Sequence, residues 1–294
     1  MRPFAIGGIQ MYVGMQNNID AIRQRLDVMM HLYPWVQMVV LSELAAHGPA
    51  AHSAQPAGGA FEQDFQEMAR RHRIWLVPGS LFEKRDGAIY NMTPVIDPSG
   101  DVVARYRKIF PFTPYEEASA AGDEFCVFDV PEVGRFGVSI CYDMWFPELQ
   151  RQMTSMGAEV ILNPVMANFV DRPADLAIVQ ASAAMFQCYV VSVNGLGVGG
   201  NGQSMIVDPA GRVLHQAGSH EAFLPYEIDL DVVRRQRERG LLGLGQPLKS
   251  FRDRPVEFPV YARDFDRRYL DSLGTLEKPR REATVVNLPP RAAE

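Results

Sequence analysis

Cysteines, clustered histidines and zinc motifs are scarce in this chain of 294 residues, and their scarcity excludes several kinds of protein. The three cysteines, Cys126, Cys141 and Cys188, show no paired spacing. With no Cys-x-x-Cys or His-Glu-x-x-His motif and six scattered histidines, zinc binding and metal-dependent hydrolysis have little support. Reduced thiols in a cytoplasmic protein are the simplest interpretation.

An excess of basic charge and long apolar runs are absent as well. The 29 basic residues are mixed along the chain with 35 acidic ones, for a net charge of −6, so we expect no nucleic-acid partner. No apolar run approaches the roughly 20 residues of a membrane span, and the N-terminal MRPFAIGGIQMYV lacks a signal-peptide layout, so we expect no membrane association. The chain does have 47% hydrophobic residues, enough for a large core.

Strand-like and helical patterns alternate along the chain, which is typical of an α/β fold. The expected strands span residues 4–13, 36–41, 74–82, 90–96, 102–106, 136–140, 160–162 and 189–193. The expected helices span residues 19–32, 61–71, 147–156 and 174–186.

Two hairpins divide this alternation into similar halves. The turns Asp97-Pro98-Ser99-Gly100 and Asp208-Pro209-Ala210-Gly211 each stand between apolar runs, with proline and glycine where a type I turn prefers them. We therefore predict two similar halves within one domain, residues 1–270, with mixed rather than purely parallel sheets. The pattern weakens from about Arg234, and residues 271–294 are predicted to form an extended arm.

Three predicted strand ends carry residues that could react together. Glu43 ends the run VVLSE, Lys108 lies in RYRKIFPF after the first hairpin, and Cys141 follows FGVSI. Catalytic groups of α/β proteins gather beyond the carboxyl ends of strands, so these side chains could converge. The glutamate could take the thiol proton, and the lysine, with the backbone N–H of Tyr142, could hold an oxyanion. Taken singly, each residue is more often packing or a surface charge.

Together the three segments resemble the nitrilase superfamily, the carbon–nitrogen hydrolases. The matching stretches are LSELAAHG, YRKIFPFTPYEE and CYDMWFPEL, of which the last is the most specific. Further matches in ILNPVMAN, CYVVSVNGLG and GQSMIVDPAGRVL extend the resemblance over roughly residues 4–230. It implies a four-layer αββα sandwich, a Glu43-Lys108-Cys141 triad, thioester chemistry without metal or organic cofactor, and pairing of subunits into a homodimer or higher homo-oligomer.

The resemblance also implies a second acid and a set of substrate-facing residues. Amidase-like members keep a glutamate eight residues after the lysine, which is Glu116 here, although the adjacent Glu117 leaves the register open. The family lines its substrate pocket at the positions of Phe112, Tyr115, Tyr142, Trp145 and Asn168.

These features favour a cysteine-dependent amidase that converts a small primary amide to a carboxylic acid and ammonia. Tyr142 replaces the tryptophan usual in true nitrilases, and no histidine follows Lys108 as it tends to in D-carbamoylases. The aromatic side chains favour an uncharged or aromatic acyl group of modest size. The alternatives are an N-carbamoyl amine or amino-acid amidohydrolase, then a nitrilase, then a catalytically silent scaffold. The intact triad argues against the scaffold, because uncompensated buried charges are costly.

Overall fold

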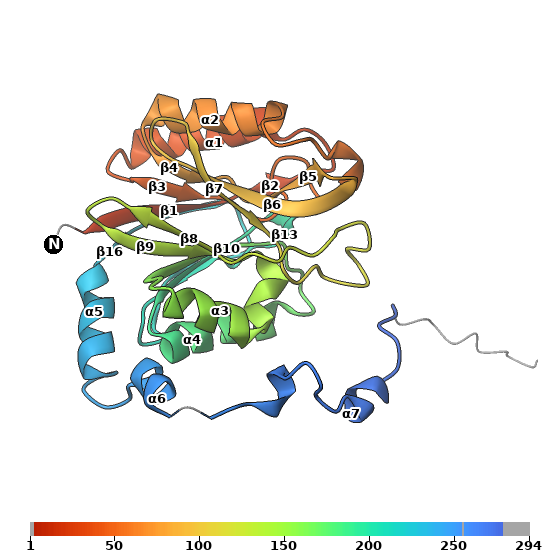
Figure 1. Cartoon of the computed structure of the whole chain (residues 1–294). Coiled ribbons are helices and arrows are strands. Elements are labelled where there is room, and N and C mark those ends of the chain that lie inside the picture. The colour runs from red at the N-terminus through yellow and green to blue at the C-terminus, as the bar shows by residue number, and fades with distance from the viewer. Residues whose placement is uncertain (1–2, 255, 279–294) are drawn as a thin grey trace, which may run out of the picture.

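Two β-sheets pack face to face between two pairs of helices (Figure 1). The computed structural model describes residues 3–254 and 256–278. Helices α1 (Ile19–Leu32) and α2 (Ala60–His72) cover the outer face of one sheet, and α3 (Pro147–Ser155) and α4 (Arg172–Phe186) cover that of the other. The predicted αββα sandwich is confirmed, and each of these helices lies where its spacing predicted it.

The first sheet has seven strands and is mixed, as predicted. Its parallel centre consists of β1 (Phe4–Gln10), β3 (Met38–Val40) and β4 (Trp75–Val77). Its antiparallel strands are β16 (Ala222–Ile228), β5 (Leu81–Arg85), β6 (Ala88–Ile96) and β7 (Val102–Arg107). The crossovers through α1 and α2 make the centre parallel, and the hairpin β6–β7 makes the edge antiparallel.

The second sheet repeats this plan with six strands. Its members are β8 (Cys126–Val130), β9 (Gly134–Val138), β10 (Val160–Val165), β11 (Tyr189–Asn194), β14 (Met205–Val207) and β15 (Val213–Gln216). A small third sheet joins β2 (Tyr12–Val13), β12 (Leu196–Gly197) and β13 (Gly200–Asn201).

The two halves have the same order of elements. The first half runs β1-α1-β3-α2-β4 and then into the hairpin β6–β7, and the second runs β9-α3-β10-α4-β11 and then into the hairpin β14–β15. The parallel pairs β1–β3–β4 and β9–β10–β11 correspond as well. The prediction of two similar halves, made from the repeated turn motif, is thus confirmed.

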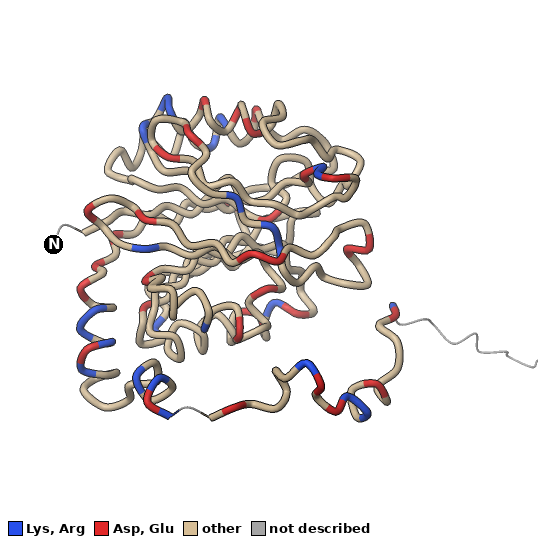
Figure 2. Tube along the Cα trace, in the orientation of Figure 1, with Lys and Arg blue, Asp and Glu red and all other residues tan. Residues whose placement is uncertain are grey.

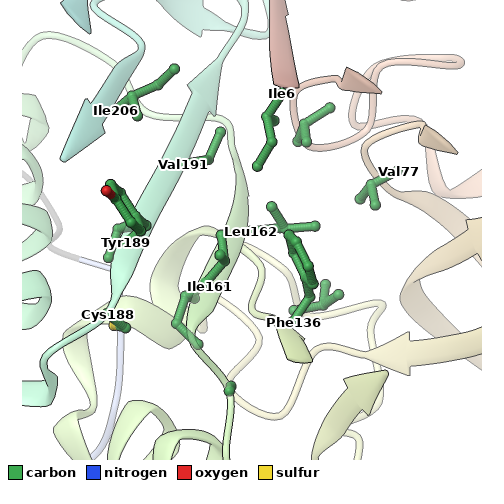
Figure 3. Packing of buried hydrophobic residues seen from close by; sticks show 14 of the residues in the cluster. Ile6, Val77, Phe136, Ile161, Leu162, Cys188, Tyr189, Val191 and Ile206 are labelled. Carbon is green, nitrogen blue, oxygen red and sulfur yellow. The ribbon is translucent and has the colours of Figure 1, made fainter. Parts of the chain in front are cut away.

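Strand composition explains why the sheets bury both faces. Every residue of β10 and β11 is buried, because one face meets the other sheet and the other face meets the helices. Figure 3 shows Ile6 and Val77 of the first sheet pointing toward Leu162 and Phe136 of the second, within one apolar cluster. This interior fixes the two sheets relative to each other, and with them the loops at their strand ends.

Residues 74–82, predicted as one strand, form two. Gly79 separates β4 from β5 with φ of 73°, and a Cβ there would lie 1.8 Å from the Ser42 carbonyl oxygen. The chain therefore turns where only glycine fits. The turn presents Ser80, whose hydroxyl accepts the Leu44 N–H at 3.0 Å. The break in the strand thus holds the loop that carries Glu43.

The C-terminal region is more regular than the sequence pattern predicted. The sequence pattern weakens from about Arg234, but regular structure continues, because α5 (Leu230–Arg239) extends past that residue with Val233 fully buried. Helices α6 (Pro247–Asp253) and α7 (Arg268–Asp271) follow, with a 3₁₀ turn over Pro259–Tyr261 between them. The edge strands β8 and β16 were not predicted either. Of the predicted arm 271–294, residues 279–294 lie outside the described part.

Charged residues are interspersed over the whole trace, as Figure 2 shows for the described residues. Among the described helices, none has the length and apolar composition needed to cross a membrane.

Candidate active site

Glu43 lies where the two sheets meet. It follows β3, and its backbone N–H donates to the carbonyl of Val165, the last residue of β10, at 3.2 Å. The side chain is 2% exposed. Burial raises the pKa of the carboxyl group above its ordinary value, and Lys108 partly offsets that effect.

Lys108 joins two carboxylates. It directly follows β7, and its Nζ donates to Glu43 Oε1 at 2.7 Å and to Glu116 Oε2 at 2.6 Å. Burial alone would lower the pKa of Lys108, but the neighbouring acidic groups, Glu43 foremost, raise it above its ordinary value. The lysine is therefore a fixed positive charge at neutral pH.

Glu116, rather than Glu117, reaches the lysine. Its Oε2 also accepts the N–H of Phe112 at 2.6 Å, and its Oε1 accepts Asn91 Nδ2 at 2.8 Å. Burial would raise the pKa of Glu116, but Lys108 and these donors lower it. Glu117 instead lies 3.6 Å from Lys278 with 69% of its side chain exposed. Only one of the adjacent acids thus points inward.

Cys141 opens a 3₁₀ helix, Cys141–Trp145, rather than closing a strand. The expected strand to residue 140 is too long, because β9 ends at Val138 and Ile140 hydrogen-bonds with Asp143 instead. Cys141 has φ of 48°, a strained backbone for a residue with a Cβ. Cys141 is half-buried at this turn and lines a cavity.

The thiol contacts both halves of the site. Cys141 Sγ lies 3.9 Å from the Met166 carbonyl oxygen, and the Glu43 carboxylate acts on the thiol electrostatically. Burial, followed by the charge of Glu43, raises the pKa of Cys141 well above its ordinary value. The resting sulfur is therefore a neutral thiol that needs a base.

Asp143 ties the cysteine turn to the lysine strand. Its Oδ2 accepts the Tyr106 hydroxyl at 2.7 Å and the Ile140 N–H at 2.9 Å, and its Oδ1 accepts the Phe110 N–H at 2.9 Å. Burial raises its pKa to about 6. This aspartate, part of the CYDMWFPEL stretch, thus fixes the distance between the nucleophile and Lys108.

A cavity of about 220 Å³ opens onto these side chains. Phe112 and Tyr115 line it beside the uncharged side chains of Leu44, Pro49, Ala51, Phe82, Ala118, Ser119 and Met166. Tyr142 and Trp145 line a smaller adjoining cavity of about 30 Å³ that also touches Cys141. Asn168 is exposed and is not among the residues that line either cavity. Within the described residues, no group of three metal-ligating side chains occurs.

Comparison with known proteins places the chain in a family. The family model described as Carbon-nitrogen hydrolase matches residues 13–238. The chain belongs to this family. It therefore hydrolyses carbon–nitrogen bonds, and the predicted membership of the nitrilase superfamily is confirmed.

Individual carbon–nitrogen hydrolases agree with this assignment. The chain is 32% identical to human "Omega-amidase NIT2" over 201 residues, 63% of this chain and 72% of the relative. It is 32% identical to the "Deaminated glutathione amidase" of Dictyostelium discoideum over 204 residues, 62% of this chain and 69% of the relative. The crystal structure of a carbon–nitrogen hydrolase from Helicobacter pylori G27 has a TM-score of 0.74 at 25% identity, covering 85% of this chain and 97% of that one.

Sequence reasoning missed two buried groups of this carbon–nitrogen hydrolase. Asn91 joins both glutamates, and Arg172 forms an ion pair with Asp175 beside the smaller cavity. Asn91 lies in a run that was assigned only as a strand. The signal that could have found it is a polar side chain in the otherwise apolar end of that strand. Arg172 and Asp175 gave no distinctive signal, since charged residues are common where a helix begins.

Proposed function

We propose that the chain is a cysteine-dependent amidase that hydrolyses a small primary amide to a carboxylic acid and ammonia. The observation that carries this proposal is the difference in hydrogen bonding between the two carboxylate oxygens of Glu43. Its Oε1 accepts hydrogen bonds from Lys108 and Asn91, whereas Oε2 accepts none from a described residue. One carboxylate oxygen is thereby left free to take the proton of Cys141, on which Glu43 acts electrostatically.

The proposed reaction uses this arrangement in two stages. Glu43 takes the thiol proton as Cys141 Sγ attacks the amide carbon, and Lys108, with the Tyr142 N–H, stabilises the oxyanion. Glu43 then returns the proton to the departing nitrogen, which leaves as ammonia, and a thioester remains. Water, deprotonated by Glu43, attacks the thioester and restores the thiol. Glu116 has both oxygens engaged, so its proposed role is to hold Lys108.

The cavity supports a small uncharged acyl group. Its charged lining residues are Glu43, Lys108 and Glu116, all of which are engaged with one another, and the rest of the lining is uncharged. A volume of about 220 Å³ suits a small substrate. The relatives named above as amidases support an amide over a nitrile.

One observation favours the N-carbamoyl amine alternative. Asp171 and Asp175 line the smaller cavity beyond Cys141, together with Trp145 and Tyr142. Asp175 is neutralised by Arg172, whereas Asp171 shows no ion pair in the described part of the chain. An acid beside aromatic rings can hold an ammonium group, as a cationic amine substrate would require.

An ammonia-release screen tests these alternatives directly. Specificity constants are compared for an amide, its nitrile and its N-carbamoyl analogue on matched acyl chains, and hydroxylamine is added to divert a thioester to a hydroxamate. We expect the amide to be preferred and a hydroxamate to form. A tenfold preference for either analogue would overturn the amidase assignment but leave the triad in place.

We also propose a cytoplasmic homodimer or higher homo-oligomer. Large apolar side chains on the C-terminal segment lie exposed, including Phe258, Tyr269 and Leu276, and Met185 of α4 is 47% exposed. A second copy covering them would remove this apolar surface from water. The described cysteines are free thiols, which suits a reducing compartment. Light scattering at micromolar concentration should give at least twice the monomer mass, and a monomer would contradict the proposal.

A further inference from the structure

Asn91 connects every charged member of the site. It lies in β6, fully buried, and its backbone carbonyl accepts the Lys108 N–H at 2.9 Å. Its side-chain Nδ2 donates to Glu43 Oε1 and to Glu116 Oε1, each at 2.8 Å. One residue thus contacts both acids through its amide and the lysine through its backbone.

The orientation of the Asn91 amide is fixed by its neighbours. Both acceptors of Nδ2 are carboxylate oxygens, so the NH₂ group must face them and both of its N–H bonds are used. The amide oxygen consequently points elsewhere, and it is buried without a hydrogen-bond partner in the described residues. An unpartnered buried acceptor destabilises a fold, so stability alone does not account for this residue.

The two glutamates differ in how many of their carboxylate oxygens accept a hydrogen bond from Asn91 or Lys108. On Glu116, Asn91 and Lys108 take different oxygens, so both are occupied. On Glu43, Asn91 and Lys108 bind the same oxygen, Oε1, at 2.8 Å and 2.7 Å. The second oxygen of Glu43 therefore accepts a hydrogen bond from neither donor.

We propose that Asn91 is a positioning residue of the reaction, which turns the free oxygen of Glu43 toward Cys141 and keeps both glutamates ionised around one lysine. The inference rests on the proposed function of Glu43 as the base. Asn91 itself does not line the cavity, but it contacts three residues that do, Glu43, Lys108 and Glu116. Its effect reaches the chemistry through Glu43.

The proposal predicts a change in pH dependence. The titratable groups that act on Glu43 are Lys108, Glu116 and Cys141, and burial already disfavours its charged form. Asn91 donates to that charged form, as it does to Glu116, whose pKa it helps to lower. Without this donor the Glu43 pKa rises, so the fall of activity at acid pH begins at a higher pH.

Two substitutions of equal size separate the donor from the packing. Asn91→Leu keeps the side-chain shape but removes the donor, and Asn91→Asp places a third acid beside Glu43 and Glu116. Asn163→Leu is the matched control, a buried asparagine of β10 whose Nδ2 has no partner in the described residues. Each protein is assayed across pH for turnover of a small primary amide and for alkylation of Cys141 by iodoacetamide.

We expect the acid limb of both profiles to move up by about one pH unit in Asn91→Leu and further in Asn91→Asp. Turnover at neutral pH should fall roughly 10- to 100-fold with little change in KM, and Asn163→Leu should keep the wild-type profile. A lower rate with an unmoved acid limb in Asn91→Asp, whether or not Asn91→Leu folds, would overturn the proposal. Alkylation needs no substrate, so it tests Asn91 even if no amide is turned over, a result that would contradict the proposed function instead.

Discussion

Each half of the molecule has a junction, the backbone hydrogen bond made by the residue that follows the last strand of its hairpin. The two junctions are alike in the backbone but carry different side chains. In the first half, Lys108 follows β7 and its N–H donates to the Asn91 carbonyl at 2.9 Å. In the second, Ala217 follows β15 and its N–H donates to the Ser204 carbonyl at 2.8 Å. The strand registers agree, since Met92 pairs with Arg107 and Met205 with Gln216.

The side chains at the two junctions differ in charge. Around Ser204 every partner is neutral: its hydroxyl donates to Gln10 Oε1 and accepts the Asn194 N–H, and Asn194 bonds the backbone of Ala167 and Gly202. Around Asn91 the partners are two carboxylates and a lysine. The neutral junction is buried, and the charged one borders the cavity. The same backbone position is thus a candidate catalytic site only in the half where ionised side chains surround it and face a cavity.

The substitution with the largest expected effect removes the thiol of Cys141, on which the charged junction is proposed to act. Cys141→Ala should abolish turnover, because no other described thiol is close to Glu43, and should leave the fold intact, since alanine fits the turn. Cys188→Ala is the control and should retain activity. Substrate-protected alkylation followed by peptide mapping checks the assignment, and stable labelling of Cys188 with full loss of activity would disprove it.

Substitutions that neutralise the charged junction should have the next largest effect on the rate. Glu43→Gln removes the proposed base and is expected to lower the rate roughly 10²- to 10⁴-fold. Lys108→Met removes an oxyanion donor and is expected to lower it roughly 10²- to 10³-fold. Steady-state kinetics should show these losses in kcat. If either variant keeps more than a tenth of wild-type activity, the charged junction is not the catalytic one.

Breaking the neutral junction should affect stability rather than chemistry. Asn194→Ala removes donors and acceptors from Ala167 and Gly202 in a buried site, so we expect a loss of roughly 2–4 kcal/mol in the free energy of unfolding. Urea denaturation measures this loss, and kcat at a temperature where the variant is folded should match wild type. A large fall in kcat without loss of stability would erase the distinction between the junctions.

Periodicity and turn chemistry predicted an α/β fold of two similar halves, whereas its four layers were predicted from the family resemblance. The spacing of Ile19, Ile22, Leu26 and Met29 predicted α1 over its full length, because a helix buries one face in each turn. The edge strand β15 alternates little between buried and exposed residues, and β8 was missed although it buries alternate residues. Local patterns carry less information where a strand has one neighbour.

The candidate site was predictable only in part, for a physical reason. Glu43, Lys108 and Cys141 each lie shortly after a strand, β3, β7 and β9, and catalytic groups gather beyond the carboxyl ends of strands. Asn91 contacts Glu43 across 48 residues of chain, a pairing that depends on register and side-chain direction. The turn at Cys141 depends on Asp143 binding the Ile140 N–H, which periodicity does not describe.

Asp143 offers a pH-dependent test of the link between the halves. Its pKa is raised by burial from 3.8 to about 6, so its contribution to stability is fully present below about pH 4 and is lost as the pH rises through 6. The shift corresponds to roughly 3 kcal/mol. Asp143→Asn cannot ionise, so the difference in unfolding free energy between wild type and variant should shrink as pH rises from 4 to 7. Urea melts at both values measure it, and a constant difference would contradict the buried, shifted carboxyl group.

The smallest expected effect compares two adjacent acids. Glu116 is bound to buried Lys108, whereas Glu117 faces Lys278 at 3.6 Å with side chains 69% and 50% exposed. Exposed ion pairs contribute roughly 0–1 kcal/mol, so Glu117→Gln should leave both stability and kcat/KM within about twofold of wild type. Glu116→Gln should instead lower kcat/KM by at least tenfold, since it loosens the proposed oxyanion donor. Parallel kinetics on the two variants decide the register, and equal losses would mean that the inward position of Glu116 has no functional consequence.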